Sequence, residues 1–272
     1  MQNIDPLFIL QPIVVIIVCT AILVYWRLKR RFHLIVLVYS LLAYAMAIAL
    51  KEAVQLPTIN TVIGTFGAHS AVLGAYYGLQ TVIFEVGLAY LVAWYAFNHG
   101  AIGKKDAEAY GSGLAFWENA GLLGVLPLLS LIVDFSILST NTPLAQTVYD
   151  QLSKNAPGLF ASASQALPSI ALGIVERTSS TLFHVAWGYL CVMAAVYKKK
   201  RLFLIALPMG FVDFLVPLTI SEHIVLFESV VLGLAVLSAI VAWYMARHTR
   251  ESVEGKPFMN EAGASNIQKP YP

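Results

Sequence analysis

Ionisable side chains lie inside the apolar stretches of this chain, at Glu85, Glu118, Asp134, Glu176, Arg177, His184, Asp213 and Glu228. A charged Asp, Lys or Arg at the centre of a membrane helix costs about 2.5–3.5 kcal/mol on insertion scales, so such groups should face one another or water. Carboxylates and an imidazole in that setting can accept protons, orient water and stabilise an oxyanion. We therefore expect an interior polar site. Asp134 and Glu228 lie near the external boundary, where we expect them to reach solvent, and Glu118 lies near the cytoplasmic edge.

The deepest members of this set are Glu85, Glu176, Arg177, His184 and Asp213. Arg177 and His184 are two helical turns apart and share one helix face, and Glu176 lies at the edge of that face. In one interpretation these groups act on a molecule bound between the helices. In the other, Glu176 or Asp213 neutralises Arg177, His184 donates to a carbonyl, and the network only joins helices.

The elements that must position these residues are membrane helices. About seven apolar stretches approach or exceed the roughly 20 residues that cross a hydrocarbon core, at 6–26, 34–50, 71–97, 114–137, 167–196, 202–219 and 224–246. The chain is 58% hydrophobic and only 12% charged, against about 25% charged residues in soluble domains. We predict an all-α, polytopic helix bundle in the cell membrane, formed by residues 1–250 and followed by a flexible cytoplasmic tail at 251–272.

Basic residues indicate the orientation of the bundle. All Lys and Arg residues except Lys51, Lys154 and Arg177 fall in the alternate gaps that would face one side of the membrane, or in the tail. By the positive-inside rule, the N-terminus is external and the C-terminus is cytoplasmic.

The two longest gaps between the apolar stretches are residues 51–70 and 138–166. Residues 51–70 contain Pro57 and two glycines among moderately apolar residues, which is compatible with an external loop, a re-entrant segment or an eighth span. We favour the first two, since an added crossing would invert every later basic loop. Residues 138–166 are polar and predict an external loop with a surface helix around 144–153.

Four short segments carry most of the interior polar residues, namely Phe84-Glu85-Val86, Gly111-Ser-Gly113-Leu114-Ala-Phe-Trp-Glu118, Glu176-Arg177 with His184, and Phe211-Val-Asp213-Phe214. Their order and spacing resemble the YhfC family of intramembrane peptidases, whose pattern is E-E, G-x-G-H-G-x-x-E, E-R followed by six residues and H, and H-x-x-x-D-F. The resemblance covers most of the chain. It implies a bundle of seven to eight helices, shared with the CAAX-prenyl-protease, PrsW and γ-secretase APH relatives.

The resemblance implies that Glu85 is the base and His184 a second catalytic group, with a polar network of Glu118, Glu176, Arg177 and Asp213. The chain departs from the family pattern, because Val86 replaces the second glutamate and Leu114 and Met209 stand at histidine positions. The cation expected after the E-E pair is also missing. Catalytic zinc usually takes three His, Glu or Cys ligands. We therefore predict no metal site, and zinc only if the peptidase interpretation holds.

The expected function is a scaffold or partner-binding membrane subunit with a peptidase-like fold and impaired catalysis. The alternative is an active glutamate- and histidine-dependent intramembrane peptidase, and the lesser alternative is a proton-coupled transporter that uses Glu85, Asp213 and Glu176 as a relay. A wet cavity where Glu85 meets His184 or Glu118 would favour catalysis. The expected partners are the lipid bilayer and either a membrane protein or a transmembrane peptide substrate.

Other classes are excluded by missing residues. The last span, 224–246, has no lysine for a retinal Schiff base, and His184 alone lies deep enough for a haem ligand. Basic residues cluster at membrane edges without an aromatic-interleaved patch, so nucleic acid is not an expected partner. Cys19 and Cys191 both lie in spans, where a buried thiol is the simplest interpretation.

Overall fold

The computed structural model describes residues 4–140, 142–218 and 223–254, and within these ranges every regular element is helical. In this part of the chain six helical runs are long and apolar enough to cross a membrane: Pro6–Arg30, Ile35–Phe66, Ala71–Asn98, Lys104–Leu138, Ala163–Tyr197 and Ile224–Ser252. The predicted all-α membrane bundle is confirmed, and the chain is a multi-pass membrane protein.

Two of these runs contain π-helical turns between α-helices. The third run is composed of α3 (Ala71–Gln80), the π-helix η2 (Thr81–Val86) and α4 (Gly87–Asn98). The fourth contains α5 (Ala107–Ala115), the π-helix η4 (Phe116–Val125) and α6 (Leu126–Leu138). The first run includes α1 (Leu10–Arg30), and the second is the single helix α2 (Ile35–Phe66).

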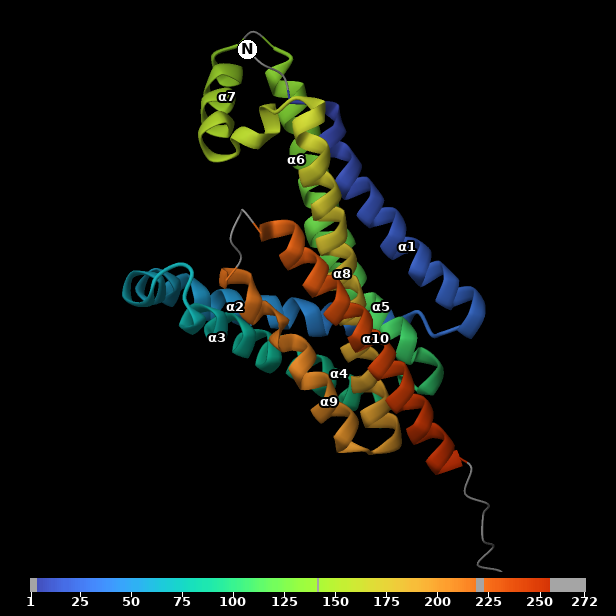
Figure 1. The fold of residues 1–272 in the computed structure, drawn as a ribbon. Helices are drawn as coiled ribbons and strands as arrows, with labels where there is room; N and C mark the ends of the chain where they lie inside the picture. Colours follow the sequence, from blue (N-terminus) through green and yellow to red (C-terminus); the bar gives the residue numbers. More distant parts are fainter. Residues whose placement is uncertain (1–3, 141, 219–222, 255–272) are drawn as a thin grey trace, which may run out of the picture.

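The long helix α8 (Ala163–Tyr197) is the centre of the bundle (Figure 1). In its most apolar 18-residue stretch 72% of the residues are buried, against 11% in α10 (Ile224–Glu254), so α8 is interior and α10 peripheral. Ser162 and Gln165 form a capping box at the start of α8, and Lys198, in the left-handed conformation, caps the end of α8. Helices α4, α5, α9 (Lys200–Gly210) and α10 all pack on it.

Glycines set the crossing of α5 and α8. A Cβ on Gly111 would lie 2.5 Å from the carbonyl oxygen of Val185, and one on Gly188 would lie 2.5 Å from the Cα of Gly111. Any larger side chain would collide with backbone at this crossing. The close approach brings η4, which follows α5, against the middle of α8.

The predicted span 202–219 is not one continuous α-helix. It forms α9 and then the 3₁₀-helix η6 (Phe211–Leu218), which lies against α3. A Cβ on Gly74 of α3 would lie 2.4 Å from the carbonyl oxygen of Phe214, and the Phe211 ring lies over Gly78. Glycines on α3 therefore admit η6 closely, which holds Asp213 toward η2.

The expectation of an external loop at 51–70 was wrong for residues 51–66, which are helical, and whether this segment re-enters the membrane stays a prediction. Helix α2 continues without a break to Phe66 and includes Pro57, which gives it a length of about 48 Å for 32 residues. Polar side chains tie this extension to α3: Gln55 donates to Gln80 at 3.0 Å, and the hydroxyls of Thr58 and Tyr76 are 2.7 Å apart. In Figure 1, α2 and α3 run crosswise to α8 and project from the bundle.

The polar segment 138–166 contains α7 (Pro143–Asn155), which confirms the surface helix predicted around 144–153. The predicted tail begins too early, because α10 continues through Glu254; residues 255–272 of that tail lie outside the described residues. Basic residues of α1, of α10 and of the 3₁₀-helix η3 (Lys104–Asp106) gather at one end of the bundle. Which side of the membrane this end faces stays a prediction.

Candidate functional site

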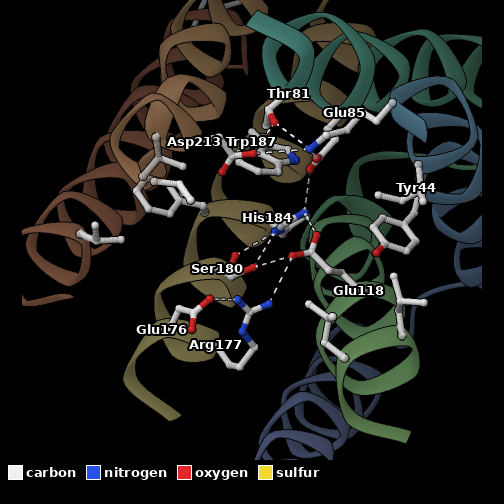
Figure 2. A pocket seen from close by; sticks show the side chains of 18 of the residues that line it. Tyr44, Thr81, Glu85, Glu118, Glu176, Arg177, Ser180, His184, Trp187 and Asp213 are labelled. Carbon is white, nitrogen blue, oxygen red and sulfur yellow. Dashed lines mark hydrogen bonds and ion pairs between the residues drawn. The ribbon is translucent and has the colours of Figure 1, made fainter. Parts of the chain in front are cut away.

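Both carboxylates nearest to the centre of the bundle lie on π-helical turns. Glu85 is in η2 and Glu118 is in η4. A π-helical turn shifts the register of side chains relative to an α-helix, and such turns occur frequently at functional sites. Here the two turns present their carboxylates to the same residue of α8, His184 (Figure 2).

Glu85, Glu118 and His184 form a compact group of three donors. The Nε2 atom of His184 lies 2.7 Å from Glu118 Oε2 and 3.3 Å from Glu85 Oε2. One ligand atom from each residue lies within 4.8 Å of the other two. The side chains of His184, Glu85 and Glu118 are only 5%, 8% and 16% exposed, so all three donors are largely buried.

The tautomer of His184 follows from its other nitrogen. Nδ1 lies 2.9 Å from the backbone carbonyl oxygen of Ser180, which can only accept, so Nδ1 carries a hydrogen. A neutral imidazole then has its lone pair on Nε2. Although two carboxylate oxygens lie within contact distance, neither is aligned for a hydrogen bond, and Nε2 has no hydrogen-bond partner among the described residues.

Lys51 of α2 lies beside Glu85 on the other side of the group. Its ammonium is 2.5 Å from Glu85 Oε1, 2.9 Å from Thr81 Oγ1 and 3.5 Å from Asp213 Oδ2. The Thr81 hydroxyl in turn donates to Asp213 Oδ2 at 2.5 Å. Sequence analysis missed Lys51 because it placed the residue at the start of a loop. The family pattern has a cation shortly after this glutamate, and the chain lacks one there. In the structure, Lys51 provides a cation beside Glu85 instead.

The Glu118 carboxylate is held mainly by α8. The Ser180 hydroxyl donates to Glu118 Oε1 at 3.0 Å, and the Asn119 amide donates to Ser180 Oγ at 3.1 Å. The Arg177 guanidinium lies 4.0 Å from Glu118 Oε1 and also pairs with Glu176. Glu176 is 49% exposed, so of the predicted network it lies furthest toward solvent.

Except for Asn119, all of these groups line one cavity of about 490 Å³. Three further residues with polar groups line it that were not predicted for the site, Tyr44, Trp187 and Glu228. Within the described part of the chain, the Tyr44 hydroxyl and Glu228 Oε2 are buried and have no hydrogen-bond partner. The expectation that Glu228 reaches solvent was wrong, because its side chain turns into the bundle and is 6% exposed.

The structure thus brings together every residue predicted for the site, in two groups. Glu85, Glu118 and His184 meet directly, and Arg177 and Glu176 border them. Asp213 joins Lys51 rather than Arg177. The sequence does contain a signal for Lys51, because it is a lone lysine within an apolar sequence that is compatible with a helix. This signal can be recognised only when residues 35–66 are considered as one helix.

Fold and site together define a polytopic membrane helix bundle with buried carboxylates and a histidine around an internal cavity. Comparison with family models agrees: residues 13–247 match the model of the YhfC intramembrane metalloprotease family, and the chain belongs to this family. No curated protein and no solved structure gave a match.

The family description implies a metal ion, and the residues present fit one. Histidine nitrogen and glutamate oxygens are ligands of catalytic zinc, which takes three protein ligands and keeps a position open. The buried lone pair on His184 Nε2 faces two carboxylates, and its Nδ1–H is held by a carbonyl as in many metal-bound histidines. The two histidine positions that the chain lacks are filled by Leu114 and Met209, which are buried in the apolar core.

Proposed function

We propose that this protein is an active intramembrane peptidase that holds a divalent metal ion between Glu85, Glu118 and His184. The observation that carries the proposal is the buried Nε2 of His184, which faces two carboxylate oxygens without a hydrogen bond. Acceptor atoms this close, on largely buried side chains, need a positive charge between them, which a proton on the imidazole or a bound cation can supply. A metal ion supplies that charge to all three donors at once.

A metal ion bound there would polarise a peptide carbonyl and lower the pKa of bound water. The remaining chemistry comes from the chain. Ser180 fixes one oxygen of Glu118, and Lys51 fixes one oxygen of Glu85, so each carboxylate directs its other oxygen toward His184. Glu85 and Glu118 would then be occupied by the metal ion. We therefore choose Asp213, a carboxylate that lines the same cavity, as the group that accepts a proton from water.

The substrate would be a peptide segment that enters the membrane interior. Tyr44 lines the cavity, and its hydroxyl, which has no hydrogen-bond partner among the residues that the structure describes, can donate to the carbonyl oxygen of such a segment. Apolar side chains of the same cavity, such as Ile48, Leu122 and Val216, would contact apolar substrate side chains. The volume of about 490 Å³ suits a few residues of an extended peptide rather than a whole helix.

A scaffold without catalysis is the second candidate, and Lys51 favours it. Its ammonium already provides a cation to Glu85 and Asp213, and it joins α2 to η2 and η6 as a structural ion-pair network would. In that case the cavity would bind no metal, and the protein would act by binding a membrane partner.

Metal content and cleavage, measured on the same sample, separate the two functions. The full-length protein in lipid nanodiscs is loaded with Zn²⁺ or Mn²⁺, dialysed, and tested for retained metal by mass spectrometry and for cleavage of membrane-tethered peptide reporters. We expect about one ion per chain and metal-dependent cleavage, both lost in Glu118→Gln. Glu52→Gln, which neutralises an exposed carboxylate of α2, is the matched control. A folded wild-type protein that retains no metal and cuts no reporter would establish the scaffold instead.

A further inference from the structure

A second cavity, of about 650 Å³, lies at the basic end of the bundle and shares no lining residue with the candidate active site. Helices α1, α5, α8 and α10 contribute to its walls, and its volume is in the range of about 300–1,000 Å³ for small-molecule sites. Six basic side chains and two acidic ones line it: Lys29, Arg30, Lys104, Lys105, Arg247 and Arg250, with Glu108 and Glu251. Positive charge is therefore in excess.

The charge is confined to one end of this cavity. Along α10 the lining changes from Ala239 and Ala242, toward the middle of the membrane helix, to Arg247 and Arg250 at its end. On α8 the buried residues Ala186 and Met193 continue the apolar wall. The cavity has the polarity of an amphiphile, with one anionic end and one apolar end.

Tryptophans place the basic end at the depth of lipid headgroups. Trp26 of α1 and Trp243 of α10 both line the cavity, and tryptophan is enriched at the membrane–water interface. The Arg30 guanidinium lies 5.9 Å from the Trp26 ring, and the Arg247 guanidinium lies 5.4 Å from the Trp243 ring. These contacts hold two cations beside tryptophans, one on α1 and one on α10.

Ion pairs orient the same two arginines. Arg30 contacts Glu108 at 2.5 Å, and Arg247 contacts Glu251 at 2.9 Å. A guanidinium has five donors, so one carboxylate leaves donors for a second acceptor such as a phosphate. Basic pockets between membrane helices are suited to anionic lipid headgroups.

We propose that this cavity is a binding site for one anionic phospholipid. The basic residues at the mouth bind its phosphate, and an acyl chain lies along the apolar wall formed by α8 and α10. The charge pattern and the interfacial tryptophans favour a lipid over a soluble phosphate, which would use only the mouth.

Native mass spectrometry of the full-length protein tests this directly, with phosphatidylglycerol and phosphatidylcholine as competing probes. The pocket variant is Arg30→Gln/Lys105→Gln/Arg247→Gln. The control, Lys198→Gln/Lys199→Gln/Lys200→Gln, removes three exposed charges from the α8–α9 turn, outside the cavity. We expect the wild type and the control to retain one phosphatidylglycerol, and the pocket variant to bind it roughly 100-fold more weakly, at about fivefold per removed charge. Equal losses in both variants, or no preference for phosphatidylglycerol, would overturn the proposal.

Two further measurements keep the result interpretable. Glycerol 3-phosphate at the same concentration should not displace the lipid; if it does, the site is one for soluble phosphates and the lipid proposal is wrong. Thermal unfolding of each variant is measured first. If the triple pocket variant does not fold, Lys105→Gln replaces it, because Lys105 is exposed, and we expect about fivefold weaker lipid binding.

Discussion

The two halves of the candidate site satisfy their charges in different ways. In the half built from α2, η2 and η6, the Lys51 ammonium contacts Glu85 and Asp213. In the half built from η4 and α8, Glu118 is held by the neutral Ser180 hydroxyl and by Arg177 at 4.0 Å, while His184 Nε2 has no hydrogen-bond partner among the described residues. The first half already contains its cation. The nearest cation in the second half is Arg177, at 4.0 Å from Glu118, and in our proposal a bound metal ion completes this half.

Removing the built-in cation should have the largest effect. In Lys51→Met, the buried Glu85 and the partly exposed Asp213 both lose the ammonium, so we expect a loss of about 3–5 kcal/mol in the free energy of unfolding, mainly from Glu85. Reversible unfolding in bicelles measures it. The double variant Lys51→Met/Glu85→Gln, which removes both charges of the closest pair, should recover part of the loss. A single variant as stable as the wild type would mean that Lys51 does not stabilise this half.

Removing the central donor of the other half should affect metal binding more than folding. We expect His184→Ala to weaken Zn²⁺ or Mn²⁺ binding roughly 100-fold or more, since even residues that only support a ligand contribute 10–100-fold. Competition with a chelating dye measures the affinity. His99→Ala, at the exposed end of α4, is the control and should bind metal like the wild type. Equal affinity in both variants would contradict the assigned site.

A smaller effect should follow when the support of Glu118 is removed. Ser180→Ala deletes the hydroxyl that donates to Glu118 Oε1 but keeps the backbone carbonyl that holds His184, so we expect about tenfold weaker metal binding. Ser179→Ala is closely matched, because the buried Ser179 hydroxyl donates to the carbonyl of Val175 in its own helix. The same chelator competition should leave Ser179→Ala unchanged. If both serine variants weaken binding equally, the effect comes from α8 as a whole.

Sequence analysis anticipated the η4–α8 half better than the other half. The spacing of Arg177 and His184 predicts one polar face on a long helix, and the structure places both on α8. The contact between Glu118 and His184 depends on the Gly111–Gly188 crossing and on a π-helical turn. Neither the helix register nor the partner of a glycine can be determined from local sequence alone.

The Lys51 half was harder to predict because its elements break local rules. Pro57 and the glycines after it suggested a loop, yet α2 continues through Pro57 because its extension is bonded to α3. The apolar stretch 202–219 suggested a full span, yet it changes to a 3₁₀-helix that packs on Gly74 and Gly78. In both cases tertiary contacts decide the local conformation.

X-ray absorption at the metal edge of the Zn²⁺- or Mn²⁺-loaded, full-length protein tests the central claim most directly. If Glu85, Glu118 and His184 hold the ion, the zinc spectrum should contain a nitrogen and oxygen shell at about 2.0–2.2 Å with the outer scattering of one imidazole, and that scattering should vanish in His184→Ala. A sulfur shell, an ion surrounded only by water, or a spectrum that His184→Ala leaves unchanged would contradict the account.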